Sequence, residues 1–389
     1  YDSYNLHHEK YFQEIDLRSW VGSRGADEVY QMWLGAGLTP ESWDSIHRKM
    51  IGASLARGAG YWYFDMNNFF ADPFMHEKIR EAYQVAKQLN AMPKSTFRPD
   101  VCLVASDVIN PYLSDQFTAS GWGRDYQQMM LQCSGVPFNR YSLNEILQHK
   151  ELQNFKMYIF EESTFISEQQ RQEIKTKLLN NNRTIVWMGD SGYFSENGKS
   201  LDAMSDLIGM KVRTEEDYAR RTAVIDNTNN LLTKNVAPFQ GCAEMLMAIL
   251  DTNGGASSFA GRYQPFWIED SSAIALAHYT ETSQTAMATK QLKGWKSIYL
   301  AATQSLGPQL FNNIAKQAGA FVVGAAGQEV DMSGNFASIH ALKSGSYTLR
   351  LPPGKSRVVD AQTGEVLSDK KPLYTFPLVA QQTYWYFFE

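Results

Sequence analysis

Val101-Cys102-Leu103-Val104-Ala105 is an apolar run bounded by polar residues on both sides. Two more runs of this kind follow at Met157–Phe160 and Thr184–Met188, and helical stretches such as Arg124–Ser134 and Ser167–Leu179 separate them. Buried strands that alternate with helices pair in parallel within a doubly wound sheet. These runs therefore predict an α/β domain in the middle of the chain.

The same layer continues towards the C-terminus. Lys296–Leu300 resembles a further strand and Leu310–Ala318 a further helix, and Ala320–Gly324 is expected to close the layer. Beyond about Gly327 apolar and polar residues alternate, which is typical of half-buried antiparallel strands. Strands are expected at Phe336–Leu342, Ser346–Leu351 and Thr383–Phe388, with turns at Pro352-Pro353-Gly354 and Thr363-Gly364. The sequence therefore predicts a small antiparallel β domain after the α/β domain.

The residues before this middle domain predict two βα units. Tyr11–Leu17 is expected to form a short strand and Tyr61–Met66 a second, buried one. Thr39-Pro40 opens a helix between them, because threonine caps a helix N-terminus and proline fits its first position. Asp72-Pro73 opens another helix in the same way. We expect three domains, at residues 1–97, 98–326 and 327–389.

Composition excludes several classes of protein. The chain has 389 residues, 44% of them hydrophobic and 20% charged, which is typical of a globular protein with two or three domains. The net charge is −5 without a basic block, so we expect no nucleic acid partner. No apolar run approaches the roughly 20 residues that span a bilayer, so we expect a soluble protein without membrane contact, in a bacterial cytoplasm or periplasm. The sequence itself does not specify the compartment.

Cysteines, histidines and glycines offer little chemistry. Three widely spaced cysteines, Cys102, Cys133 and Cys242, form neither a disulfide framework nor a zinc cluster, and we expect Cys102 and Cys133 to be buried thiols. His7-His8 is expected to be a solvated pair rather than a metal site, and no phosphate-binding glycine loop opens a helix. The chain begins at Tyr1 without a methionine or signal peptide, and we expect a fragment or a processed chain.

Carboxylates lie at the ends of both opening strands. Glu14 and Asp16 end the first, and Asp65 ends the second. In a (β/α)₈ barrel, catalytic groups lie at the carboxyl ends of the strands, and a retaining glycosidase uses two carboxylates about 5–5.5 Å apart. The alternative is structural: these groups cap the following loops or pair with Arg18.

Aromatic residues surround these carboxylates. Trp20, Trp62 and Tyr63 offer flat faces on which sugar rings stack, but aromatic side chains are more often part of a core. If Glu14 and Asp65 converge on an aromatic-lined pocket, the glycosidase hypothesis is favoured. An ion pair between Glu14 and Arg18 argues against it.

In order, the motifs of the chain resemble the C-terminal part of the family-42 glycoside hydrolases, the β-galactosidase-like group. The matching stretches are Phe12–Arg18, Arg48, Gly60–Met66, Phe70–Pro73, Gly294–Tyr299, Ala318-Gly319, Leu349–Pro352 and Val359–Glu365. The resemblance implies the last two βα units of a TIM barrel, a flavodoxin-like or class I amidotransferase-like trimerisation domain and a small β domain.

The resemblance also implies roles for individual residues. It places Glu14 at the nucleophile position, and Asp65 where a substrate-hydroxyl or structural contact is expected. Asp16, Arg18, Trp20 and Trp62 are the further candidates for substrate binding. It implies β-galactosides or related β-glycosides as substrates, no cofactor, no metal and a homotrimer. The acid/base glutamate of the family lies on an earlier strand that this chain lacks, so we expect the fragment alone to be inactive.

Two other functions are possible from the sequence. The amidotransferase fold is an enzyme fold, but the elbow candidate Gly189–Tyr193 contains no cysteine and does not complete a G-x-S-x-G motif. A catalytic middle domain is therefore not expected. The remaining alternative is a non-catalytic oligomerisation or carbohydrate-binding module, in which Glu14 and Asp65 are structural.

Overall fold

The computed structural model describes residues 2–21, 38–65, 70–105, 128–161, 163–215, 222–240, 265–301 and 306–389. The chain forms two compact units, which are described separately below. Tyr1–Arg98 and Val323–Glu389 make up the first unit, and Pro99–Val322 make up the second. Within the described ranges no helix is both long and apolar enough to cross a membrane.

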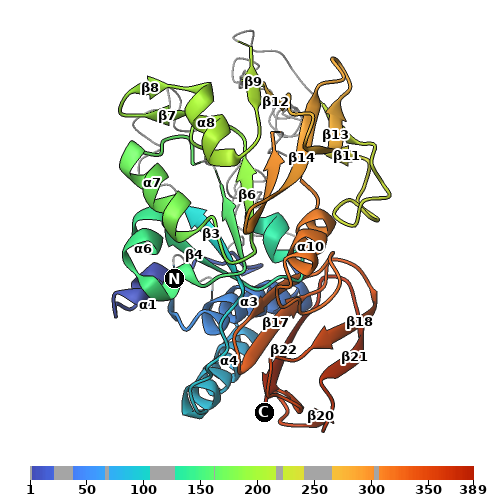
Figure 1. Ribbon diagram of the computed structural model, residues 1–389. Helices are drawn as coiled ribbons and strands as arrows, with labels where there is room; N and C mark the ends of the chain where they lie inside the picture. The colour runs from blue at the N-terminus through green and yellow to red at the C-terminus, as the bar shows by residue number, and fades with distance from the viewer. Residues whose placement is uncertain are drawn as a thin grey trace. The chain divides into compact units, whose positions relative to one another are not determined.

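The second unit is built on one large mixed sheet (Figure 1). Its parallel part has the order β15-β6-β5-β3-β4. The strands are β3 (Val101–Ala105), β4 (Phe138–Ser142), β5 (Met157–Phe160), β6 (Arg183–Met188) and β15 (Trp295–Leu300). The predicted strands of the doubly wound layer are therefore confirmed, and β4 is an additional one.

Antiparallel strands extend this sheet beyond β15, and the sequence analysis did not predict them. Along the main path, β14, β13, β10 and β11 follow β15, and β12 and β9 pair beside them. They are β9 (Val212–Thr214), β10 (Ala223–Ile225), β11 (Phe239–Gln240), β12 (Phe266–Ile268), β13 (Ile274–Tyr279) and β14 (Thr285–Leu292). The sheet is therefore mixed rather than purely parallel. Ala320–Gly324, expected to close the layer, forms no strand.

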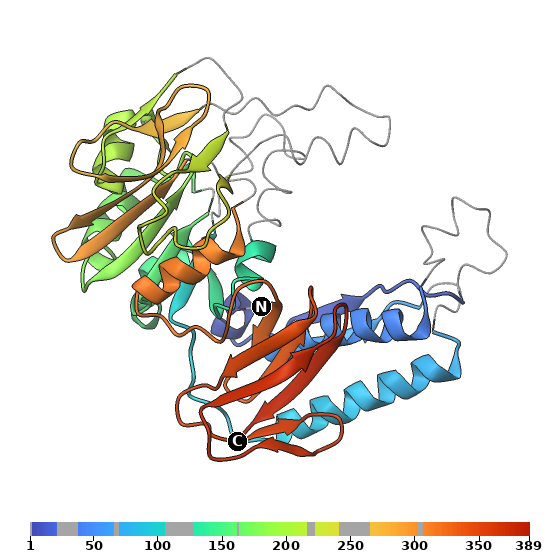
Figure 2. The same ribbon diagram turned by 90° about the vertical axis from the view of Figure 1, so that its right-hand side faces the viewer.

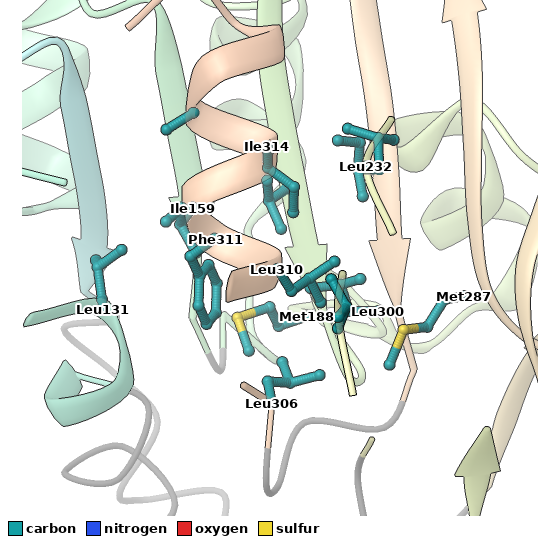
Figure 3. Packing of buried hydrophobic residues seen from close by; sticks show 14 of the residues in the cluster. Leu131, Ile159, Met188, Leu232, Met287, Leu300, Leu306, Leu310, Phe311 and Ile314 are labelled. Atoms are coloured by element: carbon teal, nitrogen blue, oxygen red, sulfur yellow. The ribbon is translucent and has the colours of Figure 1, made fainter. Parts of the chain in front are cut away.

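Helix α10 (Pro308–Gln317) covers one face of the parallel strands. Figure 3 shows Phe311 and Leu310 against Ile159, Met188 and Leu300. Among the helices described from end to end, this unit also has α6 (Leu143–Gln148), α7 (Glu168–Lys177), α8 (Leu201–Ile208) and the 3₁₀ turn η2 (Lys150–Gln153). A small hairpin joins β7 (Phe194–Ser195) to β8 (Gly198–Lys199). The helix predicted at Ser167–Leu179 is confirmed. Of the helix predicted at Arg124–Ser134, residues 128–132 are helical, and residues 124–127 lie outside the described residues.

The first unit begins with two βα units (Figure 2). After α1 (Asp2–Leu6), β1 (Phe12–Ile15) pairs in parallel with β2 (Gly60–Tyr63), and α3 (Pro40–Ala56) connects them. α4 (Pro73–Ala91) follows β2. Both predicted helix starts are confirmed: Thr39 forms a capping box with Ser42, and the Asp72 side chain accepts from the Phe74 amide.

The C-terminal residues of this unit form two antiparallel sheets. One has the order β16-β17-β22-β19-β20 and the other pairs β18 with β21. Their bounds are β16 (Glu329–Met332), β17 (Phe336–His340), β18 (Gly345–Arg350), β19 (Val358–Asp360), β20 (Val366–Ser368), β21 (Leu373–Leu378) and β22 (Thr383–Phe388). The three predicted strands, β17, β18 and β22, are confirmed.

The two ends of the chain share one hydrophobic core. Ile15, Trp43 and Ile51 belong to the same buried cluster as Phe336 and Trp385. α3 therefore packs against β1 and β2 and also against the sheet that contains β17 and β22. The fold has two compact units, and the division into three domains stays a prediction.

Candidate functional site

Side chains of β1 alternate between two environments. Ile15 and Leu17 are buried in the core that α3 helps to form, while Phe12, Glu14 and Asp16 are exposed. This is the period-two pattern of a strand with one covered face and one open face. The alternation places the candidate nucleophile on the face opposite the helices.

Pairing with β2 adds aromatic residues to this open face. Glu14 lies opposite Trp62 in the parallel register, and Phe12 lies opposite Gly60. Trp62 is 44% exposed and Phe12 is 58% exposed. A side chain at position 60 would collide with the Phe12 ring, because a Cβ there would lie 2.5 Å from Phe12 Cε1. Phe12, Glu14 and Trp62 together form what we call the open face.

On the opposite face of β2, the buried side chain of His47 contacts Tyr63. His47 Nε2 lies 2.8 Å from the Tyr63 hydroxyl, and its ring stacks on Trp43 with a centroid distance of 4.8 Å. Burial, with a smaller contribution from the charges of Arg48 and Lys78, lowers the pKa of His47 from 6.5 to about 3. Tyr63 is therefore a packing residue here rather than the sugar platform that its position in the sequence suggested.

Arg18 pairs with Asp16, not with Glu14. Within the described ranges, no hydrogen bond or ion pair reaches the Glu14 carboxylate, which stays exposed to solvent. The ion pair that would have argued against a catalytic Glu14 is therefore not present. Pairing of a strand-end carboxylate with Arg18 was predicted as the structural alternative, and the structure has this pair at Asp16.

Trp20 and Asp65 are not on the open face by strand pairing. Trp20 lies 6.2 Å from Trp43 and 6.3 Å from Phe74, ring centroid to ring centroid, beside the core. Asp65 is exposed and follows the end of β2 by two residues. Strand alternation puts Trp62, and not Asp65, in phase with Glu14. Their roles as substrate contacts stay predictions.

Phe12 is the site candidate that the sequence analysis did not name. The signal was present, since Phe12 precedes Glu14 by two residues and so shares its face in any strand. The prediction that the second strand is buried is wrong. The residues of β2 are half-buried or exposed, because one face of the β1–β2 pair carries no covering element among the described residues.

Unit 2 offers no exposed nucleophile at its elbow. Ser191 is fully buried and its hydroxyl donates to the Met188 carbonyl, 2.6 Å away. Asp190 accepts from the Thr164 hydroxyl, and burial raises its pKa. Cys102 and Cys133 are buried thiols, as expected, and Cys242 lies outside the described residues. In the part of the chain that the structure covers, no cluster of His, Cys, Asp and Glu has the arrangement of a metal site.

Comparison with known proteins shows similarity at the level of structure. No protein-family model matches the chain, and no curated protein matches its sequence. The fold is similar to a β-galactosidase from Rahnella sp. R3, with a TM-score of 0.60 and 12% identity, over 99% of this chain and 56% of that one. Gan42B, a GH42 β-galactosidase from G. stearothermophilus, gives a TM-score of 0.59 at 12% identity, over 90% of this chain and 51% of that one.

A third β-galactosidase, from the Antarctic haloarchaeon Halorubrum lacusprofundi, has a TM-score of 0.55 at 11% identity, over 97% of this chain and 61% of that one. The chain thus spans about half the length of these proteins. The resemblance to the C-terminal part of family-42 β-galactosidases is confirmed for the fold. At these identities it is a similarity of fold alone.

Proposed function

We propose that this chain is the C-terminal part of a retaining glycoside hydrolase that acts on β-galactosides or related β-glycosides. The observation that carries the proposal is the open face, where Glu14 lies exposed between Phe12 and Trp62 on the side of β1 and β2 away from the helices. The shared fold with β-galactosidases over nearly the whole chain supports it.

The finer architecture follows from the physics of parallel sheets. Parallel strands are normally covered on both faces, and among the described residues helices cover only one face of β1 and β2. A (β/α)₈ barrel satisfies this rule, since its strands face helices outside and other strands' side chains inside. We therefore propose that β1 and β2 are the last two strands of such a barrel, with the open face towards its interior.

In the proposed mechanism Glu14 attacks the anomeric carbon of the sugar. A second carboxylic acid, on a strand before β1, protonates the leaving oxygen and then acts as base when water hydrolyses the glycosyl-enzyme. Trp62 and Phe12 supply flat apolar surfaces for the sugar ring. Asp16 and Arg18, bonded to each other, offer polar contacts to hydroxyl groups. The reaction requires no cofactor or metal.

The same proposal assigns residues 98–326 to assembly. They would form an amidotransferase-like domain through which the enzyme makes a homotrimer, with no nucleic acid or membrane as partner. Sedimentation analysis of the purified protein tests this, and a monomer at micromolar concentration would contradict it.

The decisive experiment compares the unaltered protein with its Glu14→Gln variant, both expressed from the complete reading frame. Hydrolysis of an aryl β-galactoside should fall by a factor of about 10⁴ or more in the variant, because the nucleophile contributes the covalent step. In this chain, where Glu14 is exposed, Glu14→Gln should leave the melting temperature unchanged. Undiminished hydrolysis by Glu14→Gln would show that Glu14 is not the nucleophile.

A second candidate is a carbohydrate-binding or oligomerisation module without catalysis. Two exposed aromatic rings next to a carboxylate favour sugar binding as much as they favour hydrolysis. Titration of this chain with galactose and lactose separates the two. Binding without turnover in the complete protein would favour the module.

A further inference from the structure

The loop that follows β19 carries a motif for which the proposed function gives no role. Asp360 Oδ1 accepts hydrogen bonds from the backbone amides of Gln362 and Thr363, at 2.9 and 2.8 Å. Gly364, at φ +73°, donates its amide to the Asp360 carbonyl, 2.9 Å away. Val359 and Ala361 on the same stretch are buried in the core shared with α3. The backbone on both sides of Gln362 is therefore held firmly.

The side chain of Gln362 bonds to two helices at once. Its Oε1 accepts from Arg48 Nη1 on α3 at 2.5 Å, and its Nε2 donates to Glu81 Oε2 on α4 at 3.1 Å. These helices follow β1 and β2, respectively. Gln362 belongs to neither βα unit, since it lies 281 residues after Glu81 in the sequence, and its side chain links the two units.

Charged neighbours extend this link in both directions. Arg48 Nη2 pairs with Asp44 at 2.8 Å, and Glu81 pairs with Lys78 Nζ at 2.8 Å. All five side chains are half-buried, where hydrogen bonds to charged groups are stronger than in water. We call Asp44, Arg48, Gln362, Glu81 and Lys78 the clasp.

An amide is the group that this position requires. It accepts from a guanidinium on one side and donates to a carboxylate on the other, and a glutamine does both in one side chain. Glutamate would keep the acceptor for Arg48 but would place a second negative charge next to Glu81. Alanine would remove both bonds and leave Arg48 and Glu81 without this partner.

We propose that Gln362 is a positioning residue, which fixes the spacing of α3 and α4 and thereby the two strands that present Glu14 and Trp62. α3 lies between β1 and β2 in the sequence and packs on both strands, so a change in its position reaches the open face. That Gln362 fixes the spacing of α3 and α4 follows from these contacts alone. That this spacing matters for catalysis by Glu14 rests on the proposed function.

The first test needs only this chain. Hydrogen exchange of the peptides that cover β1, α3 and α4 should be about tenfold faster in Gln362→Ala and in Gln362→Glu than in the unaltered protein, because two bonds to charged groups are lost or opposed. Peptides from Pro99–Val322 should exchange unchanged and serve as the internal reference. Unchanged exchange in α3 and α4 of both variants would overturn the proposal.

Gln328 provides the matched control. It also bonds in two directions, accepting from the Leu342 amide at 2.7 Å and donating to the Lys343 carbonyl at 3.2 Å, but both partners lie in the C-terminal β segment. Gln328→Ala should therefore leave exchange in α3 and α4 unchanged. Equal acceleration in Gln328→Ala would show that general loosening of the segment, and not the clasp, is responsible.

The second test measures catalysis in the protein of the complete reading frame. Gln362→Ala should lower kcat for an aryl β-galactoside about tenfold and change KM less than twofold, since a displaced nucleophile weakens the transition state more than substrate binding. If the unaltered protein shows no hydrolysis, the proposed function is wrong, but the exchange experiment still tests whether the clasp holds α3 and α4 in place. Unaltered kcat together with accelerated exchange would overturn the positioning role.

Discussion

Replacing His47 with phenylalanine should remove a pH-dependent part of the stability of the first unit. The imidazole is fully buried, stacks on Trp43 and lies 2.8 Å from the Tyr63 hydroxyl. Burial is the main reason that its pKa falls from 6.5 to about 3, and the positive charges of Arg48 and Lys78 lower the pKa further. Phenylalanine keeps an aromatic ring at this position but cannot take up a proton.

The sign of the effect follows from proton linkage. In the unfolded chain the histidine takes up its proton below pH 6.5, while in the folded protein it stays neutral down to about pH 3. The unfolded state therefore binds more protons in this window, and stability falls as the pH is lowered through it. At pH 5 the loss amounts to about 2 kcal/mol, from 1.36 kcal/mol for each pH unit below 6.5.

The assay is urea unfolding of both proteins at pH 7.5 and pH 5.0, with pulsed hydrogen exchange of α3 as the signal from this unit. The native protein should lose about 2 kcal/mol more than His47→Phe between the two pH values. Titration of Asp44 and Asp331, whose pKa values burial raises, is common to both proteins and cancels in the difference. Tyr63→Phe, which keeps the histidine, should retain the full pH dependence. An equal loss in the native protein and in His47→Phe would refute the reasoning.

Two further substitutions test the packing of α3 and the open face. Gly52→Ala should lower the free energy of unfolding by about 1–3 kcal/mol in thermal or urea unfolding, because a Cβ there would lie 2.1 Å from Ser338 Oγ and 2.7 Å from Trp385 Nε1. Ser338→Gly in the same protein should restore part of the loss, and a stable Gly52→Ala would contradict the tight contact. Trp62→Ala should raise KM for an aryl β-galactoside about tenfold in the complete protein. In this chain, where the ring is 44% exposed, the same substitution should leave the melting temperature within a few degrees. A large fall in melting temperature with unchanged KM would instead mean that Trp62 is structural.

Local signals in the sequence determined the capped helices and the long buried strands of the fold. Thr39-Pro40 and Asp72-Pro73 fixed the starts of α3 and α4, because capping depends on a side chain and an amide within three residues of each other. The apolar runs of β3, β5 and β6 were recognisable because strands buried on both faces are continuously apolar. Glu14 could be selected because it is a carboxylate near the end of its strand and because the resemblance places it at the nucleophile position.

The antiparallel strands beyond β15 were not predictable in the same way. β10 and β12 have three residues each, and β13 begins with an exposed isoleucine, so no segment carries a full period-two pattern. They form strands because they pair with one another and with a longer strand: β14 pairs with β15, β13 pairs with β14, and β10 pairs with β13. Pairing between distant segments leaves little trace in the local sequence.

Tertiary structure alone decided that Trp62 lies beside Glu14 on the open face and which contacts hold that face. Arg18 lies within four residues of both Glu14 and Asp16, and the sequence permits either ion pair, but only Asp16 is bonded. Trp20 and Trp62 are equivalent candidates in the sequence, yet one packs beside Trp43 and the other is exposed. Likewise, Thr383 bonds to Ser45, 338 residues away, and places the C-terminal sheet on α3. The physical reason is that caps and periodicity act over a few residues, whereas burial and ion pairing depend on which distant segments come together in the fold.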